Sequence, residues 1–333
     1  MRVIGGWNPS LCTMQQSFDD AIQGFSPRLP LAVAFSGGAD STALLVACAE
    51  KWPGQVVAVH VNHGVQAAAA LFERHCKDFC AARALSLQVS RVNAAPQQGE
   101  SPEAAARRAR YKAFSALTLS GSAQTAIKSV AIAQHADDQA ETLLLALVRG
   151  GGVAGLSAMP AHWARDGLDY HRPLLCVSAA EVRRWLAVRG IDFVDDPTNS
   201  DERFTRNRIR RQIMPAMKAA FPHLLETLGR SAAHAAQAQT LLDELARDDF
   251  LRVGREGDAL AGVRALRTLS RSRQANLLRY WLKHSVNVIP STSQLNELLD
   301  QVHACSTRGH RIHIKVGQGF VERKGDALHW YNP

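Results

Sequence analysis

The sequence predicts an α/β protein in which a parallel sheet is followed by a long linker helix and a small mixed C-terminal domain. Short apolar runs alternate with helical stretches as far as Arg189, which is typical of a parallel sheet covered by helices on both faces. The segment 222–250 is rich in alanine and leucine and has few helix breakers, which favours one long helix. The chain has 333 residues, more than the roughly 250–300 over which one core keeps growing, so we expect two domains.

The apolar and helical patterns give the individual elements. Strands are predicted at 31–35, 56–61, 87–92, 130–133 and 173–177. Helices are predicted at 40–49, 67–84, 101–119, 137–148 and 178–189. Beyond the long helix we expect a helical stretch at 263–283, a helix capped by Ser291 or Ser293, and a closing strand at 311–316. The predicted domain boundaries are 1–221, 222–250 for the linker helix, and 251–333.

The charge balance favours a polyanionic partner. The chain has 39 Lys and Arg against 30 Asp and Glu, a formal net charge of +9. Such a surface attracts nucleic acid, and a basic surface that serves solubility alone is the alternative.

The cysteines and the absence of long apolar runs favour a cytoplasmic protein. The six cysteines form no C-x-x-C pair, so we expect reduced thiols. No run approaches the ~18–20 apolar residues of a membrane span, and the N-terminus lacks a secretory signal pattern. We therefore expect a cytoplasmic location and no membrane partner. The oligomeric state is left open, a homodimer included.

A glycine-rich loop follows the first predicted strand. The loop Ser36, Gly37, Gly38, Ala39, Asp40, Ser41 joins this strand to a helix, so its backbone N–H groups can point at a phosphate that the glycines allow to approach. The lysine of a Walker A motif is absent, and Asp40 instead offers a carboxylate that could hold Mg²⁺. The alternative is a tight turn in which Asp40 only caps the helix.

Polar residues end the second predicted strand at the same edge of the sheet. His60, Asn62 and His63 lie where the base or ribose of a nucleotide could rest. A single histidine at such a place is usually structural, but the pair Asn62 and His63 next to a phosphate loop makes a ligand contact equally plausible.

Acidic residues open the helix after the fourth predicted strand. Asp137, Asp138 and Glu141 follow His135 there, and Asp138 and Glu141 share a helix face. Acids in a first helical turn usually interact with the helix dipole. Because these would converge with the phosphate loop, they could hold Mg²⁺ or an ammonium substrate.

Two segments carry clustered basic residues. One comprises Arg107, Arg108, Arg110 and Lys112, and the other Arg203, Arg206, Arg208, Arg210 and Arg211. Guanidinium groups bind phosphate through two parallel hydrogen bonds, so these residues could contact ATP, RNA or both. A solvated basic face is the alternative.

Taken in order, these segments resemble the PP-loop ATP pyrophosphatase family and, within it, the tRNA(Ile)-lysidine synthetases. The resemblance covers residues 31–215 and is carried by SGGADS at Ser36, HVNHGVQ at His60, E-x-x-A-R-x-x-R-Y at Glu103, the long stretch 133–160, and DDPTNSDERFTRNRIR at Asp195. The last two are more specific than the loop, which several other PP-loop enzymes share. The stretch Arg273–Leu282 more weakly resembles the family's first C-terminal domain.

The resemblance implies a fold like that of the adenine nucleotide alpha hydrolases and a ligase reaction in two steps. ATP adenylates the C2 oxygen of the wobble cytidine (position 34) of the CAU-anticodon tRNA(Ile), and pyrophosphate leaves. The ε-amine of L-lysine then displaces AMP to give lysidine, which changes codon specificity from AUG to AUA. It also implies an ATP-binding catalytic domain at 1–221, a tRNA-binding domain at 251–333, and Mg²⁺ beside the departing pyrophosphate.

The resemblance also implies roles for individual residues. For ATP binding they are Ser36, Gly37, Gly38, Ala39, Asp40, Ser41 and His63. For catalysis they are Asp40, Arg110, Asp138, Glu141 and Arg206, with Asp40 and Asp138 as Mg²⁺ ligands. For the lysine substrate they are Asp137 and Glu141.

This sequence departs from the family pattern at a few positions. Val65, Gln66 and Gln134 stand where leucine, arginine and histidine are expected. Some members carry a further C-terminal domain that grips the acceptor stem, and we expect none before Pro333. A tRNA thiolation enzyme with the same loop is the alternative activity, although its iron–sulfur type needs cysteines spaced to hold a cluster.

Overall fold

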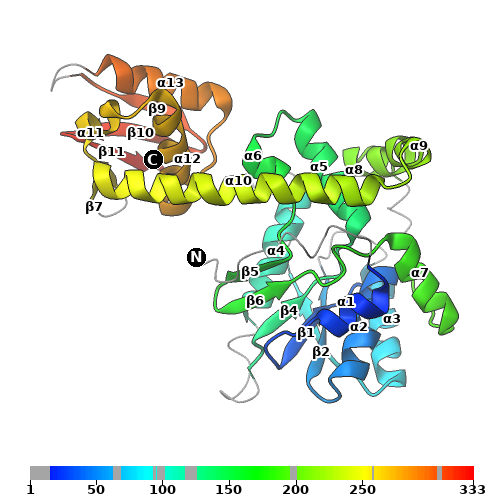
Figure 1. The fold of residues 1–333 in the computed structure, drawn as a ribbon. Helices are drawn as coiled ribbons and strands as arrows, with labels where there is room; N and C mark the ends of the chain where they lie inside the picture. The colour runs from blue at the N-terminus through cyan, green and yellow to red at the C-terminus, as the bar shows by residue number, and fades with distance from the viewer. Residues whose placement is uncertain are drawn as a thin grey trace. The chain divides into compact units, whose positions relative to one another are not determined.

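The computed structural model describes residues 16–62, 69–92, 95, 102–116, 126–195, 201–256, 259–305 and 310–333. They form two compact units, Met1–Ala236 and Gln237–Pro333. Figure 1 shows helices packed around a sheet in the first unit, and a smaller sheet with its own helices in the second.

The first unit is built on a six-stranded sheet of order β3-β2-β1-β4-β6-β5. Its strands are β1 (Leu31–Ala34), β2 (Val56–Asn62), β3 (Ser86–Arg91), β4 (Ser129–Ala131), β5 (His162–Arg165) and β6 (Leu168–His171). All neighbours are parallel except β5 and β6, which form an antiparallel hairpin. The strand order reverses between β1 and β4, and ligands bind at such switch points in open α/β sheets.

The helices of this unit connect the strands and extend beyond them. They are α1 (Phe18–Gly24), α2 (Ala39–Lys51), α3 (Ala69–Ala82), α4 (Pro102–Ala116), α5 (Ala136–Val148), α6 (Val153–Leu156), α7 (Ala179–Val188), α8 (Thr205–Arg208) and α9 (Met214–Ala220). A π-helical turn, η4 (Ile209–Ile213), joins α8 to α9 without a break. The long helix α10 (Leu224–Val253) follows, as predicted for this part of the chain.

Both faces of the sheet are buried because successive strand residues alternate between them. Leu31 and Val33 pack on one face with apolar side chains of α1, α2, α3 and α7. Ala32 points to the other face, where Tyr111 and Phe114 of α4 complete a second core. This arrangement confirms the predicted sheet with helices on both sides.

The predicted strand at 173–177 is wrong. This segment forms turns, in which the N–H of Leu175 bonds to the carbonyl of Arg172 and the N–H of Val177 to that of Leu174. The strand beside β4 is β6, which begins five residues earlier and belongs to a hairpin that we did not predict. Leu174 and Val177 are nevertheless buried, which explains why the segment has the apolar pattern of a strand.

Among the cysteines that the structure describes, Cys176 departs from the expected reduced state. Cys48, Cys76, Cys80 and Cys305 are free and buried, whereas Cys176 is disulfide-bonded. Burial, the largest influence, raises the pKa of Cys48 and of Cys76 to about 12, so both stay protonated at neutral pH.

The second unit pairs a five-stranded antiparallel sheet with three helices after α10. Its strands are β7 (Arg255–Glu256), β8 (Ala259–Ala261), β9 (His313–Val316), β10 (Gly319–Lys324) and β11 (Ala327–Tyr331), in the order β7-β8-β11-β10-β9. Its further helices are α11 (Val263–Thr268), α12 (Arg271–Ser285) and α13 (Thr292–Ala304), the last capped by Ser291. Leu277, Trp281 and Leu298 pack on Val321 and Leu328 of the sheet. The predicted stretch 263–283 is therefore two helices.

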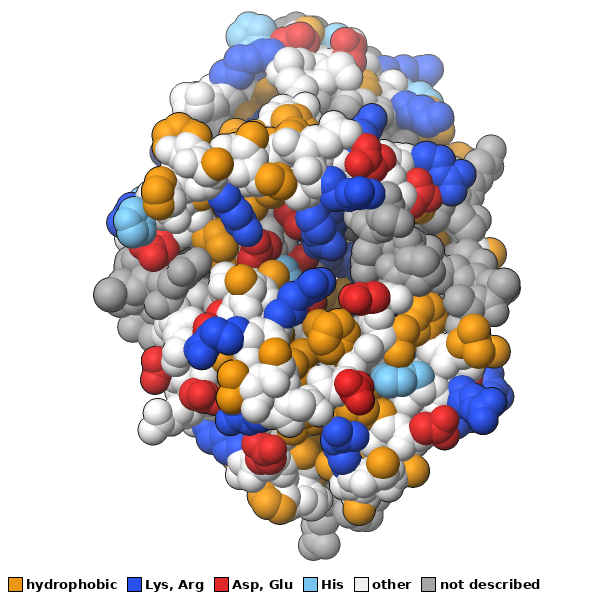
Figure 2. All heavy atoms as spheres, turned by 90° about the vertical axis from the view of Figure 1, so that its right-hand side faces the viewer, with side chains coloured by type: hydrophobic (Ala, Val, Ile, Leu, Met, Phe, Trp, Pro, Cys, Tyr) orange, Lys and Arg blue, Asp and Glu red, His pale blue; other side chains and the backbone are white. Residues whose placement is uncertain are grey.

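The surface mixes charges of both signs. On the face drawn in Figure 2, basic side chains lie next to acidic ones rather than in a region of one sign. In the part of the chain that is described, no helix combines the length and the apolar character needed to cross a membrane.

Candidate functional site

The loop after β1 takes a conformation that requires glycine. Gly37 has φ of +86°, and its carbonyl accepts a 2.9 Å hydrogen bond from the N–H of Val194. A side chain here would bring its Cβ within 3.0 Å of His75 Cδ2. The absence of a side chain at Gly37 therefore lets the loop pack closely against α3.

The same loop presents backbone donors at the start of α2. Gly38 is the N-cap and makes no side-chain cap hydrogen bond, so Asp40 does not cap this helix. The first N–H groups of a helix have no intrahelical partner and attract anions. Ser41 fixes the loop from inside, because its Oγ accepts from the N–H of Ser36 at 3.2 Å and donates to the carbonyl of Gly38 at 3.0 Å. The loop is therefore ordered before any ligand binds.

Gly37→Ala is expected to destabilise the protein by about 1–2 kcal/mol, the usual cost of a side chain at left-handed φ. ATP affinity should fall as well, because the added methyl group lies against His75 and shifts the loop. Gly54→Ala is the matched control, since Gly54 has φ of +73° but nothing within 4 Å of an added Cβ. Urea unfolding and ATP titration of both variants measure the difference. Equal losses of ATP affinity in the two variants would contradict this account.

His135 joins the loop to the acids of α5. It is the N-cap of α5, and its backbone N–H donates to Asp138 Oδ2 at 3.2 Å. Its Nε2 lies 3.5 Å from Asp40 Oδ2 and 3.5 Å from Asp138 Oδ2. The contact with Asp40 connects the loop after β1 to the segment after β4, across the switch point of the sheet.

The ring of His135 is held mainly by carboxylates. Burial, the largest influence, lowers the pKa of His135, but the hydrogen bond to Asp40 and the charges of Asp138, Asp40 and Asp137 outweigh it and raise the pKa to about 9. The ring is therefore cationic at neutral pH. A ring with both protons cannot accept the long 3.4 Å hydrogen bond from the Asp138 N–H, which is the weakest of its contacts.

The face of α5 that carries Asp138 and Glu141 binds two arginines of the following segment. The Glu141 side chain is 1% exposed, and its carboxylate accepts from Arg210 Nε at 2.6 Å and Nη2 at 2.9 Å. Arg206 Nε lies 3.3 Å from Glu141 Oε2, and Arg210 also reaches Asp138 Oδ1 at 3.1 Å. Burial, the largest influence, raises the pKa of Glu141, and the guanidinium groups oppose this.

Asp137 points away from Asp138 and Glu141. Its Oδ2 accepts a 2.8 Å hydrogen bond from the N–H of Ala179 at the start of α7, and its Oδ1 is bound by Lys218 Nζ. Burial raises the pKa of Asp137, but the hydrogen bonds from Ala179 and Lys218 and the charges of Lys218 and His135 outweigh it and lower the pKa overall. The carboxylate is therefore ionised and already holds a primary ammonium group.

A buried arginine supports the segment after β4. Arg172 is 2% exposed, its Nε donates to Gln134 Oε1, and its Nη1 donates to the carbonyl of Pro160 at 2.6 Å. Its guanidinium also lies 4.1 Å from the centre of the Trp163 ring. Gln134 stands where the family pattern has histidine, and as an uncharged acceptor it suits a neighbour that is already positive.

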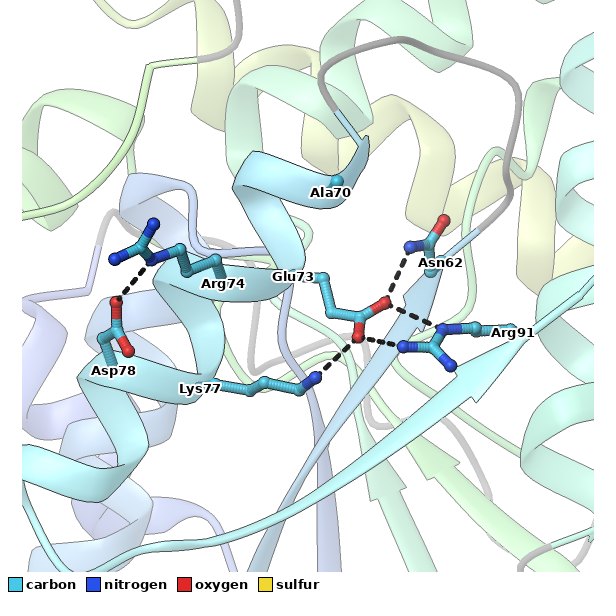
Figure 3. Close-up of a pocket in the computed structure, with 7 residues that line it drawn as sticks. All are labelled: Asn62, Ala70, Glu73, Arg74, Lys77, Asp78 and Arg91. Atoms are coloured by element: carbon cyan, nitrogen blue, oxygen red, sulfur yellow. Dashed lines mark hydrogen bonds and ion pairs between the residues drawn. The ribbon is translucent and has the colours of Figure 1, made fainter.

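Glu73 on α3 holds together the ends of β2 and β3. Its buried carboxylate accepts hydrogen bonds from Asn62 Nδ2 at 2.8 Å, Lys77 Nζ at 2.8 Å and Arg91 Nη2 at 2.6 Å, as Figure 3 shows. Together with Ala70, Arg74 and Asp78 they line a surface hollow. Asn62, which we expected near a nucleotide, thus donates to Glu73, and His63 lies outside the described residues.

The structure brings together most of the predicted site residues. The loop 36–41, Asp138, Glu141 and Arg206 form a continuous chain of contacts through His135 and Arg210. Asp137 borders this group. Arg110 is half-buried on α4. Its helix packs on one face of the sheet, and α2 packs on the other. The roles of all these residues stay predictions.

Two residues that connect the site, Lys218 and Arg172, were not singled out in the sequence, and Arg210 was named only as one member of a basic cluster. Arg210 follows Arg206 by four positions, a spacing that places both on one helix face and could have indicated a joint role. Lys218 and Arg172 gave no comparable signal, because their partners lie far away in the sequence.

Two family models and several curated relatives match this chain. Residues 11–217 match the PP-loop domain family, and residues 263–329 match the TilS substrate binding domain. A tRNA(Ile)-lysidine synthase of Polaromonas naphthalenivorans is 52% identical over 98% of this chain and 96% of its own length. Enzymes of the same name from Burkholderia pseudomallei and Escherichia coli O157:H7 are 38% and 37% identical over 93% and 90% of this chain. The chain spans 63% and 68% of their length.

A solved structure shares the fold of part of the chain. The U34-tRNA thiolase NcsA from Methanococcus maripaludis superposes with a TM-score of 0.53 over 63% of this chain and 73% of that one, at 14% identity. The PP-loop domain family supports ATP binding. Together with the near full-length match at 52% identity, it shows that the chain belongs to the tRNA(Ile)-lysidine synthase family of ligases.

Proposed function

We propose that this protein ligates lysine to C2 of the wobble cytidine of the CAU-anticodon tRNA(Ile), at the expense of ATP. The cytidine C2 oxygen attacks the α-phosphorus of ATP and pyrophosphate leaves. The lysine ε-amine then attacks C2, the C2–O bond breaks, and AMP leaves with the loss of a proton from the amine. One observation carries the proposal: at the switch point of the sheet, His135 links Asp40 of the loop after β1 to Asp138 of α5.

We assign ATP to the loop Ser36–Ser41, where the N–H groups at the start of α2 would receive its phosphates. Gly37 lets the loop pack against α3, and Ser41 keeps the loop in shape. His63 remains a proposed nucleotide contact on sequence grounds alone.

We propose Asp40 as the principal protein ligand of Mg²⁺. Among the described residues no three His, Cys, Asp or Glu side chains are grouped to hold a metal ion by themselves. Mg²⁺ commonly uses only one or two carboxylates and completes its shell with substrate phosphates and water. The Asp40 side chain is 38% exposed and lies 3.5 Å from His135 Nε2, whereas both oxygens of Asp138 are engaged. When bound, Mg²⁺ stabilises the charge of the departing pyrophosphate.

Asp137 is our proposed contact for the lysine substrate. Its pairing with Lys218 Nζ supports this proposal, because a substrate ammonium group would make the same interaction with this carboxylate. Glu141 remains the second proposed contact, and its carboxylate is held by Arg206 and Arg210 as that of Asp137 is held by Lys218.

The names of the relatives favour tRNA(Ile) over the substrate of a thiolation enzyme. The fold likeness to the thiolase NcsA is at 14% identity and carries no argument about chemistry. We propose that Arg110 and Arg206 contact phosphate or RNA, that residues 251–333 bind the tRNA, and that the reaction takes place in the cytoplasm.

The test is to incubate the protein with ATP, Mg²⁺, labelled lysine and a transcript of the CAU-anticodon tRNA(Ile). We expect label at position 34 together with stoichiometric AMP and pyrophosphate. A transcript with uridine at position 34 is the matched control and should stay unlabelled. Release of pyrophosphate without incorporation of lysine would leave an adenylating enzyme of another specificity and overturn the proposal.

A further inference from the structure

The outer face of the C-terminal sheet carries aromatic and basic side chains together. Residues that pair across an antiparallel sheet share a face, and Phe320 pairs with Tyr331 on one side and Lys315 on the other. Glu322 pairs in the same way with His313 and His329. The other face, with Val316, Val321 and Leu328, packs on the helices of this unit. The aromatic and basic face is therefore the one directed away from the core.

Three rings on this face contact one another. His313 and Phe320 stack with their centres 4.7 Å apart and their planes 5° from parallel, and the Phe320 and Tyr331 rings lie 6.0 Å apart at 29°. His313 Nε2 also lies 3.0 Å from the Tyr331 hydroxyl oxygen. His313 is exposed and the other two rings are half-buried. Mutual contacts hold the rings in place, so a ligand that stacks on them would meet an already ordered surface.

The charges around the rings suit a polyanion. Lys315 is exposed beside Phe320, and Lys324 is exposed at the end of β10. Glu322 is the acidic residue among the paired positions of this face, and Lys324 Nζ contacts it at 2.5 Å. Exposure to solvent explains the lysines on this face but not three adjoining rings. Unpaired RNA explains both, because its bases stack on aromatic rings and its phosphates attract lysines.

We propose that His313, Phe320 and Tyr331 form a stacking surface for unpaired bases of the RNA substrate, with Lys315 and Lys324 beside its phosphates. The choice of RNA as the ligand rests on the proposed function. The combination of stacked rings with flanking lysines recognises single-stranded RNA rather than a duplex, because the bases of a duplex are stacked on each other.

The experiment measures binding of the full-length protein to two fluorescent ligands, the tRNA(Ile) transcript and a single-stranded oligoribonucleotide with its anticodon-loop sequence. Phe320→Ala and Tyr331→Leu should each weaken binding about tenfold, a typical loss when a base loses its aromatic partner. Phe320→Trp and Tyr331→Phe keep a ring and should bind as the wild type does. Ile289→Ala, which changes an 81% exposed residue of the same unit, is the control. Circular dichroism and thermal unfolding confirm that each variant is folded.

The outcomes separate this inference from the proposed function. If the wild type binds and modifies the tRNA, and Tyr331→Leu and Phe320→Ala bind it equally well, the stacking surface is overturned and the proposed function is retained. Equal competition by single-stranded RNA and its duplex also overturns it. Ring-dependent binding of the oligoribonucleotide without lysine incorporation retains the surface and refutes the proposed function. Steady-state kinetics should show a higher KM for tRNA and an unchanged kcat in Phe320→Ala, because the rings supply no group to the ATP loop.

Discussion

Asp40→Asn is expected to lower ATP-dependent pyrophosphate release by about 10²–10³-fold, the usual loss when one group that stabilises developing negative charge is removed. The amide keeps the shape of the carboxylate but carries no charge to hold Mg²⁺. Affinity for tRNA should change little, since Asp40 lies in the loop and would repel rather than attract phosphate without the metal ion. Single-turnover pyrophosphate release and tRNA binding measure the two effects separately.

The matched control for this variant is Asp20→Asn. Asp20 lies in the first turn of α1, as Asp40 lies in the first turn of α2, so both changes remove a favourable interaction with a helix dipole. Only Asp40 contacts the site. If Asp40→Asn turns over at the wild-type rate at saturating Mg²⁺, the proposed metal role is wrong.

Glu141→Ala is expected to destabilise the first unit by about 3–5 kcal/mol, because it leaves two guanidinium groups near a buried position without their carboxylate. Arg206 and Arg210 would repel each other there, and the segment that carries them would detach from α5. Urea unfolding followed by far-UV circular dichroism measures the loss. Activity should fall with it, since the same arginines border the proposed site.

Two further variants test the origin of this loss. Glu202→Ala removes a carboxylate that is 41% exposed and lies 3.6 Å from Arg211, so it should cost less than about 1 kcal/mol. Glu141→Ala combined with Arg210→Met should recover part of the stability, because the double change removes charges of both signs. The stability losses of the two single variants can be added and compared with the loss in the double variant. If the double variant loses more stability than this sum, a charge imbalance is not the cause.

The residues at the ends of β1 and β4 could be predicted because local sequence determines their place. A glycine turn after an apolar strand, and acids at a helix start, mark the carboxyl edge of a parallel sheet. The hairpin β5–β6 could not be predicted in this way, because Trp163 and Tyr170 stack with each other among polar neighbours and their strands have only four residues each. Periodicity is weak over so short a run.

The partners of the site acids could not be predicted for a different reason. Lys218 is 81 positions from Asp137, and Arg210 is 69 positions from Glu141. Spacing along the chain says nothing about contacts at that range. The sequence therefore indicated which groups are present at the site. The structure was needed to show that Glu141 pairs with two arginines and that Asp40 is the less engaged carboxylate.

The π-helical turn at Ile209–Ile213 determines the directions in which the side chains of Arg206 and Lys218 point relative to each other. Arg206 and Lys218 are 12 positions apart, which in an uninterrupted α-helix would turn their side chains about 120° from each other. The wider turn absorbs one extra residue and reduces this angle to about 20°, so both can reach acids of α5. Deleting a single residue from this turn would shorten the chain by little. It would nevertheless rotate Lys218 away from Asp137, so that Arg206 and Lys218 could no longer both reach acids of α5.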